Sequence, residues 1–347
     1  MGSHDYRSFE TARAAKKVIE EIMLVQPGEN VVITADTACD MRVVRATADA
    51  AFAVGAHPVV VTQETRWRPG MEPPAPVAGA VKAADVWIEY SVAYILYTPA
   101  HRAAIEAGCR YLVLSGMDVD VLLRTIGNVD IDKTLAIGER LTEVVSGSDR
   151  IELRSEAGTD IVGTMKGRRV RHQGKRADTK GETITLLGQV TFMPIEESLN
   201  GTIVYDGTVW PPDEAGILRD PVQLTVENGV VKKIEGGREA QAMEAYIRSL
   251  DDPNMYCLAH YSLGINPGVK KVTGSIVEDE RVFGAITIGL GSQGPNHGGK
   301  GISAVGHVDG IIVKPTIILD GNVIQQDGMY TDPELVRLCR DVGLPGY

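Results

Sequence analysis

The chain has 347 residues, a hydrophobic content of 44% and a charged content of 23%, values typical of a globular protein long enough for two domains. Its 35 basic and 46 acidic residues give a formal net charge of −11, which disfavours nucleic acid and acidic membranes as partners. Four cysteines are dispersed, and no targeting segment or apolar run of membrane-spanning length is evident. These features predict reduced thiols and a cytoplasmic location.

The first 145 residues alternate between apolar runs typical of strands and segments with helical periodicity. Strands are predicted over residues 30–34, 57–62, 84–90 and 111–115, and helices over residues 9–23, 41–55, 119–126 and 132–145. Thr98-Pro99 predicts a further helix start, with a hydroxyl at the N-cap and proline at the first helical position. Strands separated by helices predict an α/β domain with a parallel sheet over residues 1–145.

Residues 146–347 have a different texture, in which short strand-like runs follow one another with turns between them. Strands are predicted over residues 151–154, 189–193, 201–205, 222–227, 230–235 and 282–290. Asn228-Gly229 and Asp320-Gly321 each separate two such runs and predict hairpins. With helices expected near residues 238–250 and 333–339, this half is predicted to be a mostly antiparallel, β-rich α+β domain.

A glycine-rich stretch lies between two of the apolar runs. Gly289-Leu-Gly291-Ser-Gln-Gly294 has the spacing of a dinucleotide fingerprint, but Pro295 follows where a helix should begin. Residues 294–300 approach a phosphate-binding loop, but Gly301 occupies the place that requires serine or threonine. Neither motif therefore predicts a nucleotide cofactor. Because glycines let the backbone approach a ligand closely, a substrate-lining loop is favoured over a plain connector.

Two imidazoles and one carboxylate form the most informative set of candidate ligands. His307-Val-Asp309 places two ligands on one face of an extended segment, and His260 precedes them in Cys257-Leu-Ala-His260. Such a set fills one face of an octahedron and leaves open positions, as in non-haem Fe(II) oxygenases. In a chain with seven histidines, the HxD spacing also arises by chance, so spacing alone leaves both interpretations open.

Other polar groups permit a functional or a plain structural interpretation. Glu196-Glu197 is either a carboxylate pair near a metal or two exposed acids at a strand end, and the acidic run 278–280 is expected to form a solvated turn. Tyr97 precedes the Thr98-Pro99 helix start at the carboxyl edge of the predicted parallel sheet, where α/β sheets bind ligands. It is either a proton donor or base, or a buried aromatic residue. The basic run 166–176 is expected to be a solvated loop or strand edge, with a substrate-facing or subunit-facing patch as the alternative.

Three segments carry a family resemblance. They are Asp251-Asp-Pro-Asn-Met-Tyr-Cys-Leu-Ala-His260-Tyr-Ser-Leu-Gly-Ile-Asn-Pro267, Gly291-Ser-Gln-Gly-Pro-Asn-His-Gly-Gly-Lys300 and His307-Val-Asp309. They resemble the 2,5-dihydroxypyridine 5,6-dioxygenases, relatives of the thermophilic aminopeptidases. The resemblance spans most of the chain and is specific mainly in residues 250–325. It implies a Rossmann-like N-terminal domain, a β-rich catalytic domain over residues 146–347 and a homo-oligomer, a dimer or a hexamer.

The resemblance also implies a ligand set. The dioxygenases bind one Fe(II) through two histidines and an aspartate, which correspond to His260, His307 and Asp309. The aminopeptidases bind two metal ions, but this chain has His260 in place of one glutamate ligand and Thr287 in place of a histidine. The segment containing Glu196-Glu197 resembles a carboxylate-bearing segment of the peptidases, so a metal-dependent hydrolase, aminopeptidase-like or acting on a cyclic amide, remains the alternative.

One departure from the dioxygenases concerns the predicted acid or base. Tyr97 stands where the family places a histidine with that role, and a second pocket histidine is replaced near Thr185 or Leu186. Tyrosine accepts protons poorly at neutral pH, which leaves open whether 2,5-dihydroxypyridine itself is the substrate.

Together these arguments predict an extradiol-like Fe(II) dioxygenase that cleaves a small hydroxylated aromatic or N-heteroaromatic ring with O2, without a nicotinamide or flavin cofactor. Tyr97 is the predicted catalytic residue. The predicted substrate contacts are Tyr97, Thr98, Thr287, Ser292 and His297.

Overall fold

The structure, a computed structural model, describes residues 6–66, 70–294 and 298–347. It divides into two compact units: unit 1 comprises Met1–Ile131 and Gly174–Leu187, and unit 2 comprises Asp132–Gln173 and Gly188–Tyr347. Within the described ranges, no helix combines the length and apolar character needed to span a membrane.

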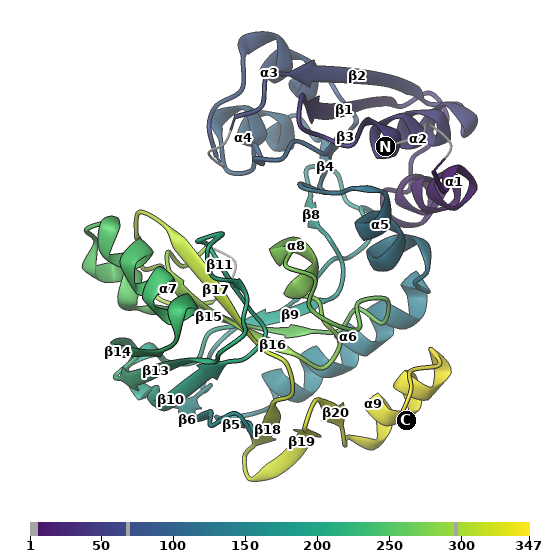
Figure 1. Ribbon diagram of the computed structural model, residues 1–347. Coiled ribbons are helices and arrows are strands. Elements are labelled where there is room, and N and C mark those ends of the chain that lie inside the picture. The colour runs from purple at the N-terminus through teal and green to yellow at the C-terminus, as the bar shows by residue number, and fades with distance from the viewer. Residues whose placement is uncertain (1–5, 67–69, 295–297) are drawn as a thin grey trace. The chain divides into compact units, whose positions relative to one another are not determined.

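Unit 1 is built on a five-stranded parallel sheet with the strand order β2-β1-β3-β4-β8. The strands are β1 (Asn30–Asp36), β2 (His57–Gln63), β3 (Val86–Glu89), β4 (Arg110–Val113) and β8 (Thr183–Thr185). The helices, seen around the sheet in Figure 1, are α1 (Ser8–Lys17), α2 (Met41–Ala53), α3 (Ala75–Lys82), α4 (Pro99–Glu106) and α5 (Val119–Leu122). π-helical turns, η1 (Val18–Ile22) and η2 (Leu123–Gly127), extend α1 and α5.

Both faces of this parallel sheet are buried. Val32, Trp87 and Tyr111 align across three strands and form one apolar cluster with side chains of α3 and α4. Ile33 and Ile88, one position further along their strands, point to the opposite face and are equally buried. The predicted α/β architecture is therefore confirmed. The predicted helix start is also present, because the Thr98 hydroxyl accepts a hydrogen bond from the backbone N–H of His101 at 3.2 Å.

Unit 2 contains two antiparallel sheets. The seven-stranded sheet has the order β12-β11-β17-β16-β15-β9-β7, and the eight-stranded sheet has the order β14-β13-β10-β6-β5-β18-β19-β20. The first consists of β12 (Gly216–Ile217), β11 (Thr208–Trp210), β17 (His307–Ile312), β16 (Ile286–Gly291), β15 (Leu258–Gly264), β9 (Gln189–Phe192) and β7 (Val170–Gln173). The second consists of β14 (Val230–Gly236), β13 (Val222–Glu227), β10 (Asn200–Tyr205), β6 (Asp160–Thr164), β5 (Arg150–Arg154), β18 (Thr316–Leu319), β19 (Asn322–Gln326) and β20 (Met329–Tyr330).

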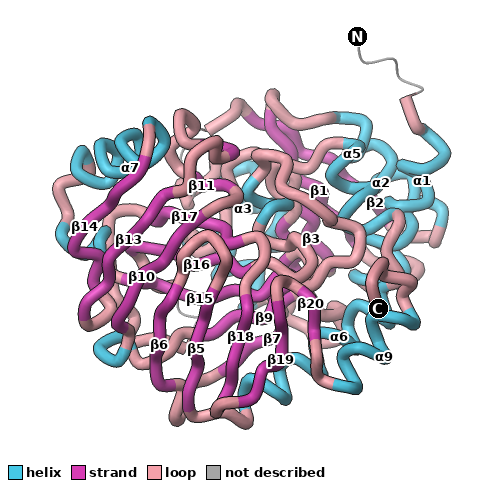
Figure 2. The backbone as a smooth tube through the Cα atoms, turned by 60° about the horizontal axis from the view of Figure 1, so that its bottom comes forward, coloured by secondary structure: helices cyan, strands magenta, loops and turns pink. Residues whose placement is uncertain are grey.

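The helical segments of unit 2 flank these sheets, as Figures 1 and 2 show. They are α6 (Ile131–Ser146), α7 (Arg238–Ser249), α8 (Ile276–Asp279), α9 (Pro333–Asp341) and the 3-10 turns η3 (Glu196–Ser198) and η4 (Pro253–Tyr256). The sequence predicted α6, α7 and α9. It did not predict α8, a single turn within a polar loop.

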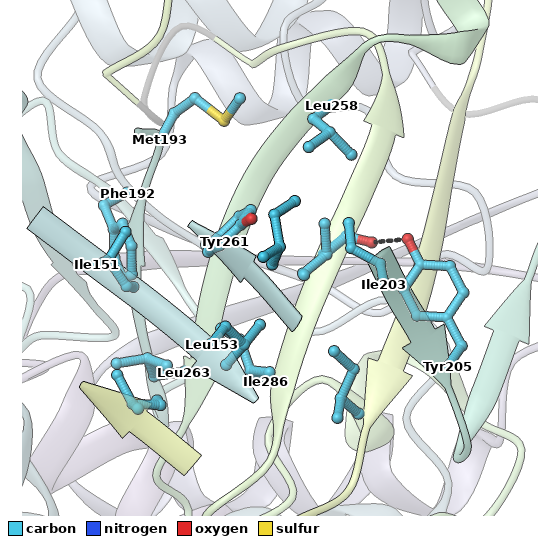
Figure 3. Close-up of a cluster of buried hydrophobic side chains, with 14 of the residues drawn as sticks. Ile151, Leu153, Phe192, Met193, Ile203, Tyr205, Leu258, Tyr261, Leu263 and Ile286 are labelled. Atoms are coloured by element: carbon cyan, nitrogen blue, oxygen red, sulfur yellow. Dashed lines mark hydrogen bonds between the residues drawn. The ribbon is translucent and has the colours of Figure 1, made fainter. Parts of the chain in front are cut away.

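A shared apolar core joins the two sheets of unit 2. Ile151 and Leu153 of the eight-stranded sheet and Tyr261 and Leu263 of the seven-stranded sheet belong to this core (Figure 3). Tyr205 also links the sheets, since its hydroxyl donates a hydrogen bond to the carbonyl of Ile288 at 2.8 Å. One face of the seven-stranded sheet therefore packs against the eight-stranded sheet.

Both predicted hairpins of the second half are present. Asn228 and Gly229 connect β13 to β14 with φ values of 52° and 74°, and Asp320 and Gly321 connect β18 to β19 with φ values of 49° and 84°. Two successive positive φ values are typical of the type I′ turn that Asn-Gly and Asp-Gly favour.

The division into units differs from the predicted domains 1–145 and 146–347 in two places. Most of α6 belongs to unit 2, and the segment Gly174–Leu187 belongs to unit 1, where it supplies β8. Strand β8 has three residues and lies among polar ones, too short for an alternating pattern to predict it. The basic run 166–176 contains the edge strand β7, in agreement with the predicted strand edge.

Candidate metal centre

Two strands of the seven-stranded sheet carry the three predicted ligands. His260 lies on β15, whereas His307 and Asp309 lie on β17, and β16 runs between these strands. Residues i and i+2 of a strand face the same way, so His307 and Asp309 project together. The ladder pairs Gly289 of β16 with both His260 and Asp309, which brings the ligands of the outer strands to the same level.

A β-bulge gives His260 its direction. Leu258 pairs with Leu290, but His260 pairs with Gly289, so one extra residue of β15 lies between the two pairs. Without this extra residue, Leu258 and His260 would point to the same face. Instead Leu258 belongs to the apolar core, and His260 points to the opposite face with the other ligands. The bulge therefore re-aims one imidazole within a continuous strand.

Gly289 makes room for the imidazoles on the intervening strand. A Cβ at this position would lie 2.5 Å from Nε2 of His260 and 2.8 Å from Cε1 of His307. Any side chain would therefore overlap both rings. Gly289 is the first glycine of the motif that resembles a dinucleotide fingerprint. Its role in the structure is instead to leave space for the two imidazole rings.

The ligand atoms of the three side chains converge. Nε2 of His260 lies 3.0 Å from Nε2 of His307 and 3.1 Å from Oδ1 of Asp309, and Nε2 of His307 lies 3.2 Å from the same oxygen. Ligands at right angles around an ion with bonds of about 2.1 Å are about 3.0 Å apart, and tetrahedral ligands about 3.4 Å apart. The observed separations fit one face of an octahedral ion. Among the described residues, these three form the group of potential ligands within mutual reach of one ion.

The second nitrogen of each imidazole also has a partner. Nδ1 of His260 lies 3.2 Å from the hydroxyl of Ser262, and Nδ1 of His307 lies 2.9 Å from the carbonyl oxygen of Ser292. A carbonyl only accepts, so His307 carries a proton on Nδ1 and directs Nε2 toward His260 and Asp309. These contacts orient both rings toward the shared point.

Burial and charge shift the pKa values of all three groups. Burial lowers the pKa of His260, and Asp309 only partly offsets this effect. Burial also disfavours the charged form of His307, but the Asp309 carboxylate prevails and raises the pKa of His307 to about 9. Burial opposes ionisation of Asp309, yet the two imidazoles hold the pKa of its carboxyl well below the usual range. The centre therefore favours a positive charge, which a bound cation would supply in place of a proton.

The predicted substrate contacts differ in how the structure places them. Thr287 lies on β16, two residues before Gly289 and on the same face of the sheet. Its hydroxyl is buried and has no hydrogen-bond partner among the described residues. Ser292 follows β16 directly and holds His307 through its carbonyl. His297 lies outside the described residues.

Tyr97 and Thr98 belong to unit 1. Tyr97 is 47% exposed and has a φ of 69°, a costly conformation for a bulky side chain, and strain of this kind is concentrated at functional positions. The interpretation of Tyr97 as a buried aromatic residue is therefore wrong. Its catalytic role stays a prediction. Thr98 is buried and caps α4, a structural use of its hydroxyl.

The two glutamates at 196 and 197 have other partners than the candidate ligands. Glu196 is 4% exposed, against the expectation of an exposed acid, and forms an ion pair with Arg168. Glu197 is exposed and pairs with Lys300. Neither belongs to the group formed by His260, His307 and Asp309.

The acidic run 278–280 is not the solvated turn that was predicted. Glu278 and Asp279 are fully buried, and the Asp279 carboxylate accepts hydrogen bonds from the hydroxyl of Thr208 at 2.6 Å and the backbone N–H of Gly274 at 2.9 Å. The run therefore closes the loop before α8. Glu280 accepts a hydrogen bond from the Gln189 amide at 3.1 Å, and burial, reinforced by the charge of Asp309, raises its pKa to about 7.

Trp210 is a further residue that the sequence did not single out. It pairs with Asp309 across the β11–β17 ladder, and directly opposed residues present their side chains on one face. Its indole is 37% exposed, and its Nε1–H donates to Asp213 Oδ1 at 2.7 Å. A fixed, partly exposed aromatic ring thus lies beside a candidate ligand. The position of Trp210 beside Asp309 follows only from the strand register, because β11 is too short to be predicted from the sequence.

Comparisons with known proteins identify the family of this chain. A sequence profile of 2,5-dihydroxypyridine 5,6-dioxygenase matches residues 12–332. The chain belongs to this dioxygenase family. The 2,5-dihydroxypyridine 5,6-dioxygenase of Pseudomonas putida KT2440 is 26% identical over 269 residues, which cover 74% of this chain and 74% of that protein. The predicted family resemblance is confirmed.

Solved structures share the fold. The structure of 2,5-dihydroxypyridine dioxygenase from Pseudomonas putida KT2440 has a TM-score of 0.79 at 19% identity and covers 97% of this chain and 100% of that chain. Wild-type AmpT from Thermus thermophilus has a TM-score of 0.68 at 14% identity and covers 94% of this chain and 100% of that chain. The predicted fold class, a parallel α/β part followed by a β-rich part, is confirmed.

Proposed function

We propose that this member of the dioxygenase family is an Fe(II)-dependent, ring-cleaving enzyme that acts on a small hydroxylated aromatic or N-heteroaromatic compound of the dihydroxypyridine kind. The observation that carries the proposal is the convergence of three ligand atoms at separations of 3.0 to 3.2 Å. Two imidazoles and one carboxylate are the ligand set of non-haem Fe(II) oxygenases. Family membership supports the oxygenase class.

His260, His307 and Asp309 would hold the metal. Fe(II) at this point would supply the open positions at which a substrate hydroxyl and O2 can be held together. The chain itself provides the surroundings. Ser262 and Ser292 orient the imidazoles through their Nδ1 atoms. Because ring cleavage takes its four electrons from the substrate and places both oxygen atoms in the product, it requires no separate reductant.

Residues on the same face of the sheet would bind the substrate ring. Trp210, opposite Asp309, offers an aromatic surface for stacking, and Thr287 offers a buried hydroxyl with no protein partner among the described residues. Such a hydroxyl is well suited to a polar substituent of the ring. Ser292 and His297 are further proposed contacts from the glycine-rich loop, and the sequence-based proposals Tyr97 and Thr98 belong to unit 1. Tyr97 would move a proton between a ring hydroxyl and solvent.

The direct test combines metal analysis with O2 uptake across dihydroxypyridines and hydroxylated benzoates. The wild-type chain is expected to retain iron and consume O2 with at least one ring of this panel. The His307→Ala variant is expected to lose both, because it removes one ligand and leaves the Asp309 carboxylate without its main counter-charge. His57→Ala, an exposed histidine on β2, is the matched control and should behave as wild type.

An anaerobic assay separates the proposal from the metal-dependent hydrolase. A hydrolase, aminopeptidase-like or acting on a cyclic amide, would continue to turn over without O2. Turnover that persists under nitrogen would reject the dioxygenase, and O2-dependent loss of the aromatic absorbance would support it.

A further inference from the structure

Glu196 is a buried carboxylate held by three residues from two segments, Arg168 before β7 and Gln293 and Lys300 of the glycine-rich loop. Its Oε1 accepts hydrogen bonds from the Gln293 amide at 2.9 Å and from the backbone N–H of Lys300 at 2.8 Å. Its Oε2 pairs with the guanidinium of Arg168, whose other terminal nitrogen donates to the carbonyl of Gly298 at 3.0 Å. A buried charge requires partners of this kind. Here one partner lies just before β7, and the others lie in the glycine-rich loop.

Gln293 extends these contacts across the loop. Its side chain is buried, and its Oε1 accepts hydrogen bonds from the backbone N–H groups of Gly301 at 2.8 Å and Ile302 at 3.0 Å. Its own backbone N–H donates to the carbonyl of Ile302 at 2.8 Å. The described residues that leave β16 and those that return toward β17 are thus tied together at Gln293, and Gln293 is tied to Glu196.

The same loop ends at a candidate metal ligand. Ser292, next to Gln293, donates its backbone N–H to the carbonyl of Gly306 at 2.9 Å. Its carbonyl oxygen accepts the Nδ1 proton of His307 at 2.9 Å. The position of the Ser292 carbonyl, and with it the orientation of the His307 ring, therefore depends on how the loop is held.

We propose that Glu196 is a positioning residue of the metal centre, which acts through Gln293 and Ser292 to fix the imidazole of His307. The proposal rests on the metal site of the proposed function. It gives Glu196 a use other than metal ligation, because both of its carboxylate oxygens already accept hydrogen bonds from loop or side-chain donors. Charge supports the arrangement: burial opposes ionisation, but the Lys300 N–H and the Gln293 amide lower the pKa of Glu196.

Glu197 provides a matched control one residue away. Its side chain is 56% exposed and pairs with the Lys300 ammonium group at the surface. Removing Glu197 therefore deletes the same type of residue in the same turn without touching the buried contacts. Exposed ion pairs of this kind contribute little to stability.

The test measures metal binding directly, so that it does not depend on turnover. Co(II) replaces Fe(II) as the probe, because its visible absorption reports the number and geometry of its ligands. Glu196→Ala is expected to weaken Co(II) binding by about 10-fold to 100-fold, the range found when outer-shell partners of ligands are removed, and to alter the Co(II) spectrum. Glu196→Gln keeps an acceptor for Gln293 and Lys300, so it should restore most of the affinity. Glu197→Ala should match wild type in both readouts.

Three outcomes decide the question. A weaker Co(II) affinity with an altered spectrum in Glu196→Ala, rescued by Glu196→Gln, supports the positioning role. Wild-type binding and spectrum in Glu196→Ala, or an equal loss in Glu197→Ala, overturn it. If thermal unfolding shows that Glu196→Ala does not fold, Gln293→Leu replaces it: it breaks the same link from within the loop and must show the same loss.

Failure of the proposed function gives a different result. If His307→Ala binds Co(II) as tightly as wild type, the probe does not occupy the proposed centre and the metal assignment itself is wrong. If His307→Ala abolishes binding while both Glu196 variants bind normally, the centre stands and only the positioning role of Glu196 is rejected.

Discussion

The two faces of the seven-stranded sheet differ in composition. On its central strands β15, β16 and β17, one face is apolar and the other is polar. The face that packs against the eight-stranded sheet is apolar and includes Tyr261, Leu263, Ile286, Ile288, Leu290, Val308 and Ile312. The other face carries His260, Ser262, Thr287, Gly289, His307 and Asp309. Strand periodicity thus allows one sheet to stabilise the unit with one face and to hold a reactive centre rigidly on the other.

A glycine on each face shows what the difference means for packing. Gly289 lies beneath the imidazoles, whereas Gly310 lies beneath the ring of Tyr205, where a Cβ would be 2.3 Å from the ring atoms. The two glycines occupy adjacent strands at neighbouring levels of the ladder. The same substitution at both positions should therefore separate metal binding from stability.

Alanine at the two glycines is expected to give the largest contrast. Gly289→Ala should weaken metal binding by at least about 10-fold to 100-fold, because its methyl group displaces rings that outer contacts otherwise hold in place. Gly310→Ala should retain metal affinity but lower the free energy of unfolding by about 1–3 kcal/mol through overpacking of the core. Metal titration and chemical denaturation of both variants provide the measurements. Equal losses of metal affinity in the two variants would contradict the separation of the faces.

Buried carboxyl groups extend the comparison to unit 1. Glu89 is fully buried at the end of β3, where its oxygens accept hydrogen bonds from the hydroxyl of Tyr111 and the backbone N–H of Ile95. In contrast to Asp309, no cationic or imidazole partner of Glu89 is found among the described residues of its unit. Its burial therefore raises its pKa to about 8, from an ordinary value of 4.5.

This shift predicts a pH-dependent stability. Between pH 4.5 and about 8 the folded chain retains a proton on Glu89 that the unfolded chain has released. The contribution of Glu89 to the free energy of unfolding therefore falls as pH rises through this window, by at most about 1.4 kcal/mol per pH unit. Glu89→Gln cannot ionise and should show a flatter profile. Denaturation of wild type and variant at several pH values measures this, and parallel profiles would refute the assignment.

The sequence predicted the ligands better than it predicted their arrangement. His307 and Asp309 follow from the spacing of residues on an extended segment. His260 was part of the predicted ligand set, but its position beside the other two ligands was not predictable, because the bulge that turns it toward them adds one residue to β15 without a distinctive composition. Gly289 was considered only as part of a nucleotide motif, since space beneath two rings is a property of three aligned strands.

Segments with strong local patterns were predicted, and segments stabilised by distant contacts were not. The hairpin turns at Asn228-Gly229 and Asp320-Gly321 require positive φ values that their residue types favour. Strand β8 and α8 are too short to have a period, and the buried acids Glu278 and Asp279 look like a solvated turn in the sequence. Their partners, such as Thr208, lie far away in the chain.

Trp210 provides a smaller test, confined to the polar face. If its indole stacks on the substrate ring, Trp210→Ala should raise KM about 5-fold to 10-fold, which corresponds to the loss of roughly 1–1.5 kcal/mol of aromatic contact. Metal affinity should not change, because Trp210 supplies no ligand. Trp210→Phe keeps an aromatic surface and should recover part of the loss. Steady-state kinetics with the ring identified in the O2-uptake panel would measure this, and an unchanged KM in Trp210→Ala would exclude stacking.

Two tyrosines on the apolar side provide the smallest and most closely matched test. Tyr205 and Tyr261 are both buried, but the hydroxyl of Tyr205 donates to the Ile288 carbonyl at 2.8 Å, whereas that of Tyr261 has no partner among the described residues. Tyr205→Phe should lower the free energy of unfolding by about 1 kcal/mol, and Tyr261→Phe should leave it unchanged or raise it slightly, because the latter removes an unsatisfied polar group. Neither variant should change metal affinity, since both side chains belong to the apolar core between the two sheets. A loss of metal binding in either would mean that the two faces of the sheet are coupled, and that the core sets the geometry of the centre as well as the stability of the fold.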